Sequence, residues 1–453
     1  MQTPIPVDSG SRPMNPSPAS YQTTRAERLS YGGFFLGQNI IYTIQFQFLV
    51  YFYTESVGLT LASTTLLLLI ARVYDALIDP IMGAIVDKSR FKSGQYLPWL
   101  RAATYLIPLA LLAVFVRIDG GGSANLLYAY VSYLIWGMVY TTSDSPLFSL
   151  STAMTSNLYE RDKLIAYGRL AAALAAISSA AFMSIKAGLG WTGAAGVYCL
   201  IAFLVMLPLQ FTAKERVRYR RSERITFAQI AKFLFKNKYL LIYYAGYMAI
   251  GATNTLQTVV VYFANANLGD EGLVTIILGT TILPIVVIAP LLPRLIRKFG
   301  KKRLTVYGSV AAVALSIVQY YVGYDDFAVF LAFSAVRVLF MQIPMLIYGM
   351  FTADCIEYGA YRNGERTPGI AFSVQTLITK LSGALSSSLS LMLLGYFGYV
   401  EQAAQQTART LDGIWFILTI VPAVGYAVMI AAMAFYKLDE KTVARMIEHN
   451  LQR

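Results

Sequence analysis

Apolar and polar positions follow one another along this chain in long blocks. Stretches of about 20 apolar residues, enough to cross a bilayer as a helix, recur throughout and are separated by short polar connections. The pattern predicts an all-α membrane protein with twelve transmembrane helices. The expected spans are residues 30–53, 59–86, 98–117, 125–149, 164–186, 193–212, 240–264, 272–293, 304–322, 326–352, 368–396 and 413–436.

Lys and Arg are distributed unevenly over the polar connections. Every second connection is basic, as in 88–101, 214–224 and 294–303, whereas the connections between them hold few basic residues. Basic loops remain on the cytoplasmic side of a membrane. Both termini belong to the basic set. We therefore expect a multi-pass protein of the plasma (cytoplasmic) membrane with both ends in the cytoplasm.

The longest basic connection divides the spans six and six, which predicts two six-helix halves. The expected parts are a disordered cytoplasmic N-tail at 1–29, an N-terminal six-helix bundle at 30–212, a cytoplasmic linker at 213–239, a C-terminal six-helix bundle at 240–436 and a cytoplasmic C-tail at 437–453. Amphipathic patterns occur at 226–236 in the linker and at 438–451 in the C-tail. We interpret both as helices on the membrane surface rather than as partner-binding segments.

Composition excludes several classes of protein. The chain is 57% hydrophobic and 13% charged, against about 25% charged residues in soluble proteins. The basic residues behind its net charge of +13 cluster in the connections, which favours membrane orientation over nucleic-acid binding. The sequence shows no phosphate loop, zinc-protease helix, serine elbow or channel filter. Glycines within 188–193 match a dinucleotide-binding pattern by letter, but no strand precedes them, so a tight turn is expected rather than an enzyme site.

Cysteine and histidine are too rare to carry chemistry inside the membrane. Cys199 and Cys355 lie far apart and predict neither a disulfide framework nor a metal site. The single histidine, His449, falls in the polar C-tail. Proton chemistry within the spans therefore falls to carboxylates.

Charged residues inside the apolar spans are the strongest functional signal, because charge is costly in a bilayer and rarely idle there. Asp75 and Asp79 lie four residues apart, so they share one helix face, and Arg72 lies on that face too. Two carboxylates and a basic residue pointing together inside a membrane indicate a cation site.

Further intramembrane charges are Asp144, Arg169 and Lys380, and Asp144 follows a run of hydroxyl residues that includes Thr141. Carboxylate and hydroxyl oxygens can form a cage for Na⁺, or a carboxylate kept neutral by burial and a neighbouring acid can carry H⁺. The alternative is a structural network in which Arg72, Arg169 and Lys380 only neutralise the acids.

A second group of charges follows the tenth span. Asp354, Glu357 and Arg362 lie at the end that we expect to be cytoplasmic. We interpret them as a salt-bridged gate or loop anchor rather than a substrate site.

Many of these residues occur in motifs of one known family. The most specific stretch is 71–87, which carries Arg72, Asp75, Asp79 and Asp87. Further matches are Tyr31-Gly32, Tyr51-Phe52-Tyr53-Thr54, Trp136-Gly137, Asp144-Ser145-Pro146, Tyr167-Gly168-Arg169, Ala353-Asp354, Tyr358-Gly359 and Ser373-Val374-Gln375-Thr376. Over most of its length the chain resembles the glycoside–pentoside–hexuronide:cation symporters, the melibiose-permease type of the major facilitator superfamily.

The resemblance implies a role for each matching residue. Asp75 and Asp79 resemble the family's cation-binding acids, and Thr141 resembles its hydroxyl ligand. The carboxylate of Asp144 and the guanidinium of Arg169 look like the pair that binds sugar hydroxyls. Lys380 and Gln375 resemble central residues of the family's facing half. We expect Arg72, Asp87, Asp354, Glu357 and Arg362 to serve as gating or ion-pair residues.

The chain departs from the family pattern at several positions. Gln38 and Asn39 stand where a Lys-Asp pair is found, and Met345 and Phe148 stand where aromatic residues stack on sugar. Phe148 still offers an apolar face to a sugar ring. Ile78 replaces an asparagine between the two cation-binding acids. The loss of that oxygen ligand favours H⁺ over Na⁺.

The combined expectation is a major-facilitator transporter that moves a sugar, glycoside or uronide together with a monovalent cation by alternating access. Its partners would be the solute, the cation and the lipid bilayer, with no nucleic acid and no cofactor beyond the coupling H⁺ or Na⁺. One alternative is a lysolipid transporter in which Arg169 and Lys380 hold an acidic head group. Another is a non-transporting membrane sugar sensor, although the short C-tail counts against it.

Overall fold

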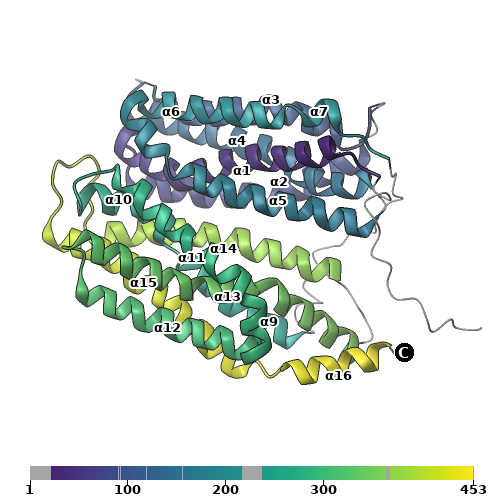
Figure 1. Cartoon of the computed structure of the whole chain (residues 1–453). Coiled ribbons are helices and arrows are strands. Elements are labelled where there is room, and N and C mark those ends of the chain that lie inside the picture. Colours follow the sequence, from purple (N-terminus) through teal and green to yellow (C-terminus); the bar gives the residue numbers. More distant parts are fainter. Residues whose placement is uncertain are drawn as a thin grey trace, which may run out of the picture.

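The chain folds into two bundles of helices that lie side by side. The computed structural model describes residues 22–89, 91, 93–118, 120–155, 157–216, 237–363 and 368–451. In Figure 1 the purple-to-teal helices of the first half form one bundle and the green-to-yellow helices of the second half form the other. The expected linker helix at 226–236 lies outside the described residues.

The first half contains seven described α-helices and a short π-helical continuation of the first. Their bounds are α1 Arg25–Tyr51, η2 Phe52–Val57, α2 Leu61–Lys88, α3 Leu97–Val114, α4 Gly121–Met154, α5 Leu158–Ser179, α6 Phe182–Met206 and α7 Leu209–Thr212.

The second half contains eight described helices. Their bounds are α9 Lys238–Ala252, α10 Leu256–Ala266, α11 Leu273–Phe299, α12 Lys301–Val322, α13 Phe327–Asn363, α14 Pro368–Tyr396, α15 Ala408–Phe435 and α16 Glu440–Leu451.

Helices occupy all the expected spans, and the differences lie at their ends and breaks. Six helices in the described ranges are long and apolar enough to cross a membrane on length and hydropathy alone. The first helix begins at Arg25, earlier than its apolar run, because Thr24 and Glu27 form a capping box that satisfies the first amides. The expected turn near 188–193 is confirmed at Gly190, whose φ of 69° and ψ of 179° interrupt α6.

The expected span 240–264 is broken into α9 and α10. The hydroxyl of Thr253 donates to the carbonyl of Ala249 at 2.8 Å. The hydroxyl of Thr255 donates to the carbonyl of Ile417 on α15 at 2.6 Å. At the break itself, the carbonyl of Asn254 accepts from the hydroxyl of Ser386 on α14 at 2.7 Å. This bond gives a polar partner to a backbone group outside the helices, as a lipid environment requires.

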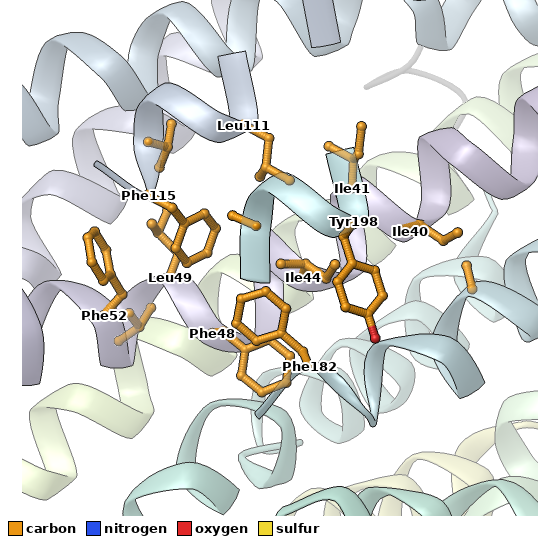
Figure 2. Packing of buried hydrophobic residues seen from close by; sticks show 14 of the residues in the cluster. Ile40, Ile41, Ile44, Phe48, Leu49, Phe52, Leu111, Phe115, Phe182 and Tyr198 are labelled. Atoms are coloured by element: carbon orange, nitrogen blue, oxygen red, sulfur yellow. The ribbon is translucent and has the colours of Figure 1, made fainter. Parts of the chain in front are cut away.

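Aromatic packing around α1 builds the core of the first half. Figure 2 shows Ile44 and Phe48 of α1 directed at Phe182 and Tyr198 of α6 and at Phe115 beyond α3. The rings of Phe48 and Phe182 stack with centroids 4.7 Å apart. Because lipid is as apolar as these side chains, close van der Waals packing rather than apolar burial holds such helices together.

The last helix, α16, packs on the protein. Its Val443 is buried, and the side-chain amide of Asn450 donates to the carbonyl of Glu357 on α13 at 3.1 Å. The ring of His449 lies edge-on to Tyr361, with centroids 4.9 Å apart. The amphipathic helix expected at 438–451 is therefore present, and its buried face contacts α13.

Candidate functional site

An ion pair joins the two halves at the centre of the candidate site. The ammonium of Lys380 on α14 lies 3.5 Å from Oδ2 of Asp144 on α4. The two side chains are 44% and 30% exposed, so the pair stays open to a solute. The structural alternative had placed Lys380 among the cations that neutralise acids, and this contact is compatible with both interpretations.

The backbone hydrogen bonding of α4 is interrupted around Asp144. Pro146 has no N–H, so the carbonyl of Thr142 loses its usual helical partner. The hydroxyls of Thr142 and Ser143 donate to carbonyls three residues back, at 2.6 and 2.8 Å. Bonds of this kind compete with the regular helix pattern. The turn that carries Asp144 therefore combines a carboxylate with extra oxygen atoms.

The expected cation site lies where α2 and α4 approach each other closely. Asp75 is half-buried, and a Cβ placed on Gly137 would lie 3.1 Å from its Oδ1. Thr141 follows Gly137 by four residues, so both lie on one face of α4. The backbone of α2 carries Asp79 one turn beyond Asp75, but the side chains of Asp79, Arg72, Asp87 and Arg169 lie outside the described part of the structure.

We expect Gly137→Val to weaken cation coupling, because the new side chain must displace the Asp75 carboxylate. Cation stimulation of solute binding should fall by about 5- to 10-fold, the lower range of coupling between two sites. The measurement is solute affinity in purified protein with and without the coupling ion. Gly122→Ala on the same helix is the control, because nothing lies within 4 Å of its Cβ position. Equal behaviour of the two variants would contradict the close Asp75 contact.

The expected residues on α1 have different surroundings. Gln38 is buried, and its amide donates to the hydroxyl of Ser143 at 2.9 Å. Asn39 is half-buried and donates to the carbonyl of Phe35 at 2.8 Å. In this conformation Gln38 serves the contact between α1 and α4 and is not open to a solute.

Three further expected substrate residues have different surroundings in the described part of the structure. Phe148 is 55% exposed, and its ring lies edge-on to Phe35 with centroids 5.2 Å apart. Gln375 is half-buried, and its Oε1 has no hydrogen-bond partner. Met345 lines a cavity of about 160 Å³ between the halves.

Sequence reasoning missed Arg337, which lines the same cavity from α13. This side chain is 2% exposed, and one of its terminal nitrogens donates to the carbonyl of Leu418 at 3.3 Å. Within the described residues, its Nε has no hydrogen-bond partner. An arginine within the apolar span 326–352 was the available signal, because intramembrane charges are rarely idle.

The charges after the tenth span all have partners within the second half. Asp354 forms an ion pair with Lys301 at the start of α12. Burial raises the pKa of Asp354, and the Lys301 ammonium opposes that shift. The carboxylate of Glu357 accepts from Asn450 at 3.2 Å. The Arg362 guanidinium donates to the hydroxyl of Tyr358 at 2.7 Å, a bond that raises the pKa of Arg362.

A set of contacts ties the two halves at the end opposite the termini, and we call it the far-end clamp. Its residues are Tyr51, Glu55, Lys186, Glu271, Tyr399 and Gln402.

In the far-end clamp, Glu271 pairs with Lys186 and accepts from the hydroxyl of Tyr51 at 2.7 Å. Glu55 accepts from the hydroxyl of Tyr399 at 3.0 Å and from the backbone N–H of Gln402 at 2.9 Å. Burial raises the pKa of Glu55, opposed by these hydrogen bonds. Each carboxylate therefore fastens one half to the other, and the sequence analysis did not anticipate either contact.

Comparisons with known proteins agree with this architecture. The chain is 28% identical to "Uncharacterized symporter YjmB" of Bacillus subtilis over 93% of this chain and 94% of that protein. It is 26% identical to "Glucuronide carrier protein homolog" of Escherichia coli over 92% and 93% of the two chains. A bacterial homologue of the human lysosomal transporter Spinster shares the fold, with a TM-score of 0.64 at 12% identity over 94% and 97% of the two chains.

These relatives are membrane transporters, not enzymes. They confirm the expected twelve-helix major-facilitator fold and the resemblance to the glycoside–pentoside–hexuronide:cation symporters. A family model described as "MFS/sugar transport protein" matches residues 30–440. The chain therefore belongs to the sugar-transport family of the major facilitator superfamily.

Proposed function

We propose that this protein couples the movement of a sugar, glycoside or uronide to a monovalent cation, with H⁺ favoured over Na⁺. The observation that carries the proposal is the Lys380–Asp144 pair, which joins the halves while staying open to a solute. The second support is the position of Asp75 against Gly137, on the α4 face that also carries Thr141. Relatives named as a symporter and as a glucuronide carrier homologue favour the same function.

The proposed mechanism links the two sites through helix packing. A cation at Asp75 and Asp79 neutralises α2, so that α2 packs against α4 in a geometry that lets Asp144 and Arg169 hold solute hydroxyls. The halves then rock around the central site. Because coupling is reciprocal, the solute raises cation affinity by the same factor.

The ion preference follows from the oxygen ligands. Na⁺ is a hard cation and requires several oxygen ligands, whereas a proton requires a single carboxylate. Ile78 lies between the two acids and contributes no oxygen. The proposal therefore has H⁺ as the coupling ion, with both termini on the cytoplasmic side because the basic connections belong there.

Asp79→Cys tests the coupling role directly. Cation-stimulated uptake into proteoliposomes should be abolished while some solute binding persists, because the neutral thiol supplies no charge for the cation. Asp325→Cys is the control, since Asp325 lies exposed in the turn between α12 and α13. Unchanged uptake in Asp79→Cys would refute the assignment of the cation site.

The same vesicles separate the competing cargoes. Sugar or uronide counterflow supports the proposal, whereas lysolipid movement without sugar counterflow would replace it with the amphiphile alternative. A sensor would bind sugar and show no counterflow at all.

A further inference from the structure

We propose that Arg337 and the cavity it lines bind the anionic oxoacid group of the transported solute, a carboxylate or a sulfonate. The cargo is then a sugar acid rather than a neutral sugar. This inference rests on the proposed function and assigns the substrate class within it.

The cavity lies where the two halves meet. It has a volume of about 160 Å³ and is lined by residues of α1 and α5 from the first half and of α9, α10, α11, α13 and α15 from the second. Its polar lining includes the side-chain amides of Gln47, Gln257 and Gln342. A single water needs only about 15 Å³ of such space, so the cavity can receive part of a solute.

Arg337 provides an uncompensated positive charge in this cavity. Its side chain is 2% exposed, and one of its terminal nitrogens donates to the carbonyl of Leu418. Among the residues that the structure describes, no carboxylate forms an ion pair with Arg337. The Nε–H also lacks an acceptor. A buried charge without a partner is costly, and in a membrane such a residue marks a path or site for a ligand.

An oxoacid is the chemistry that completes this arrangement. The guanidinium fork presents parallel N–H groups that match the two oxygens of a carboxylate or sulfonate. A neutral hydroxyl would satisfy the Nε–H but would leave the charge uncompensated. Tyr426 does not compensate it either, because a phenol is neutral; its hydroxyl donates to the carbonyl of Met341 at 2.8 Å.

Neighbouring amides supply further donors. The Oε1 of Gln47 accepts from the hydroxyl of Ser179 at 3.1 Å, which orients the amide and leaves its NH₂ group for other acceptors. Gln47 comes from α1 and Arg337 from α13, so a bound anion would contact both halves.

The cavity adjoins the interface that carries the Lys380–Asp144 pair. Asn254 lines the cavity, and its carbonyl accepts from the hydroxyl of Ser386 on α14 at 2.7 Å. Ser386 follows Lys380 by six residues, which is about 9 Å of helix rise. The anion cavity and the hydroxyl-binding pair therefore lie along the same stretch of α14.

The experiment compares matched solutes on the purified full-length protein. The pairs are glucose with glucuronate and galactose with galacturonate, and 6-deoxy-6-sulfoglucose tests a sulfonate. The acids should bind at least about 10-fold more tightly than the neutral sugars. Arg337→Gln should weaken acid binding by about 10- to 100-fold, as expected for a charge-assisted hydrogen bond, and should change neutral-sugar binding less than about twofold.

Controls separate this inference from the general one. Arg409→Gln removes an arginine near the start of α15 and should leave the preference for acids intact. Arg337→Lys keeps the charge without the fork and should retain part of the preference. If Arg337→Gln does not fold, two other results test the anion site. The native protein should prefer the acids, and Gln342→Leu should lose that preference.

Inorganic sulfate serves as a probe without a sugar part. If the native protein binds sulfate and Arg337→Gln does not, the anion site is supported. This holds even if no sugar compound is transported, a result that would refute only the proposed function. Transport of neutral sugars as effective as that of uronates, or an equal loss of both in Arg337→Gln, would overturn the anion inference and leave sugar transport standing.

Discussion

Asp144→Asn should reduce solute binding by about 10- to 100-fold while the protein stays folded. The substitution removes a charged acceptor for solute hydroxyls, and a hydrogen bond to a charged group contributes about 1.5–3 kcal/mol. It also removes the partner 3.5 Å from the ammonium of Lys380. Because both side chains are partly exposed, the loss of their attraction should change the free energy of unfolding by only about 0–1 kcal/mol. Binding should therefore suffer far more than stability.

Solute affinity and thermal unfolding, measured on the same preparation, check this separation. Asp325→Asn is the control because it removes an exposed acid of the second half. The double variant Asp144→Asn/Lys380→Gln distinguishes the two explanations of the pair. If the acid only neutralises Lys380, the double variant recovers binding, whereas an acid that holds the solute gives no recovery. Affinity of Asp144→Asn within about twofold of the native protein would exclude a direct role.

The combined variant Glu55→Gln/Glu271→Gln should open the far-end clamp. Each substitution keeps the shape of the side chain and removes its charge, so Glu271 loses its ion pair with Lys186. Glu55 also loses its charge-assisted bonds to Tyr399 and Gln402. If each change costs about 1 kcal/mol, the ratio of open to closed molecules rises about 30-fold, since 1.4 kcal/mol corresponds to a factor of 10.

Alkylation of a cysteine placed at Thr54 measures that shift. Thr54 is fully buried and contacts Tyr262 across the halves at 2.8 Å. With Cys199 and Cys355 replaced, the alkylation rate should rise by about 10-fold or more when the clamp is removed. Asp325→Asn should leave the rate unchanged. An unchanged rate in the clamp variant would show that other contacts hold this end closed.

Several features could be predicted from local sequence because their causes are local. Apolar runs of sufficient length predict the spans, since a helix satisfies its own backbone groups in lipid. The spacing of Asp75 and Asp79 predicts a shared helix face without knowledge of any other helix. The α1 start at Arg25 was missed, because the Thr24–Glu27 capping box extends the helix beyond its apolar run.

Other features depend on contacts between distant segments. At the break between α9 and α10, the carbonyl of Asn254 takes its partner from Ser386 of α14, and the polar run 253–258 does not show which helix supplies that partner. Buried Gln38 was grouped with substrate residues because sequence position does not show that Ser143 takes up its amide. The resemblance paired Asp144 with Arg169, whereas the described contact of Asp144 across the halves is with Lys380.

The sequence by itself determined the class of protein, the spans and the presence of costly charges inside them, because each of these depends on composition and helical spacing alone. Only the tertiary structure decided which charges have partners. It joins Lys380 to Asp144, ties Lys186 to Glu271 and, within the described residues, leaves the buried Nε–H of Arg337 without an acceptor. The physical reason is that compensation of a buried charge depends on atoms within a few ångströms in space, and those atoms come from helices far apart in the chain.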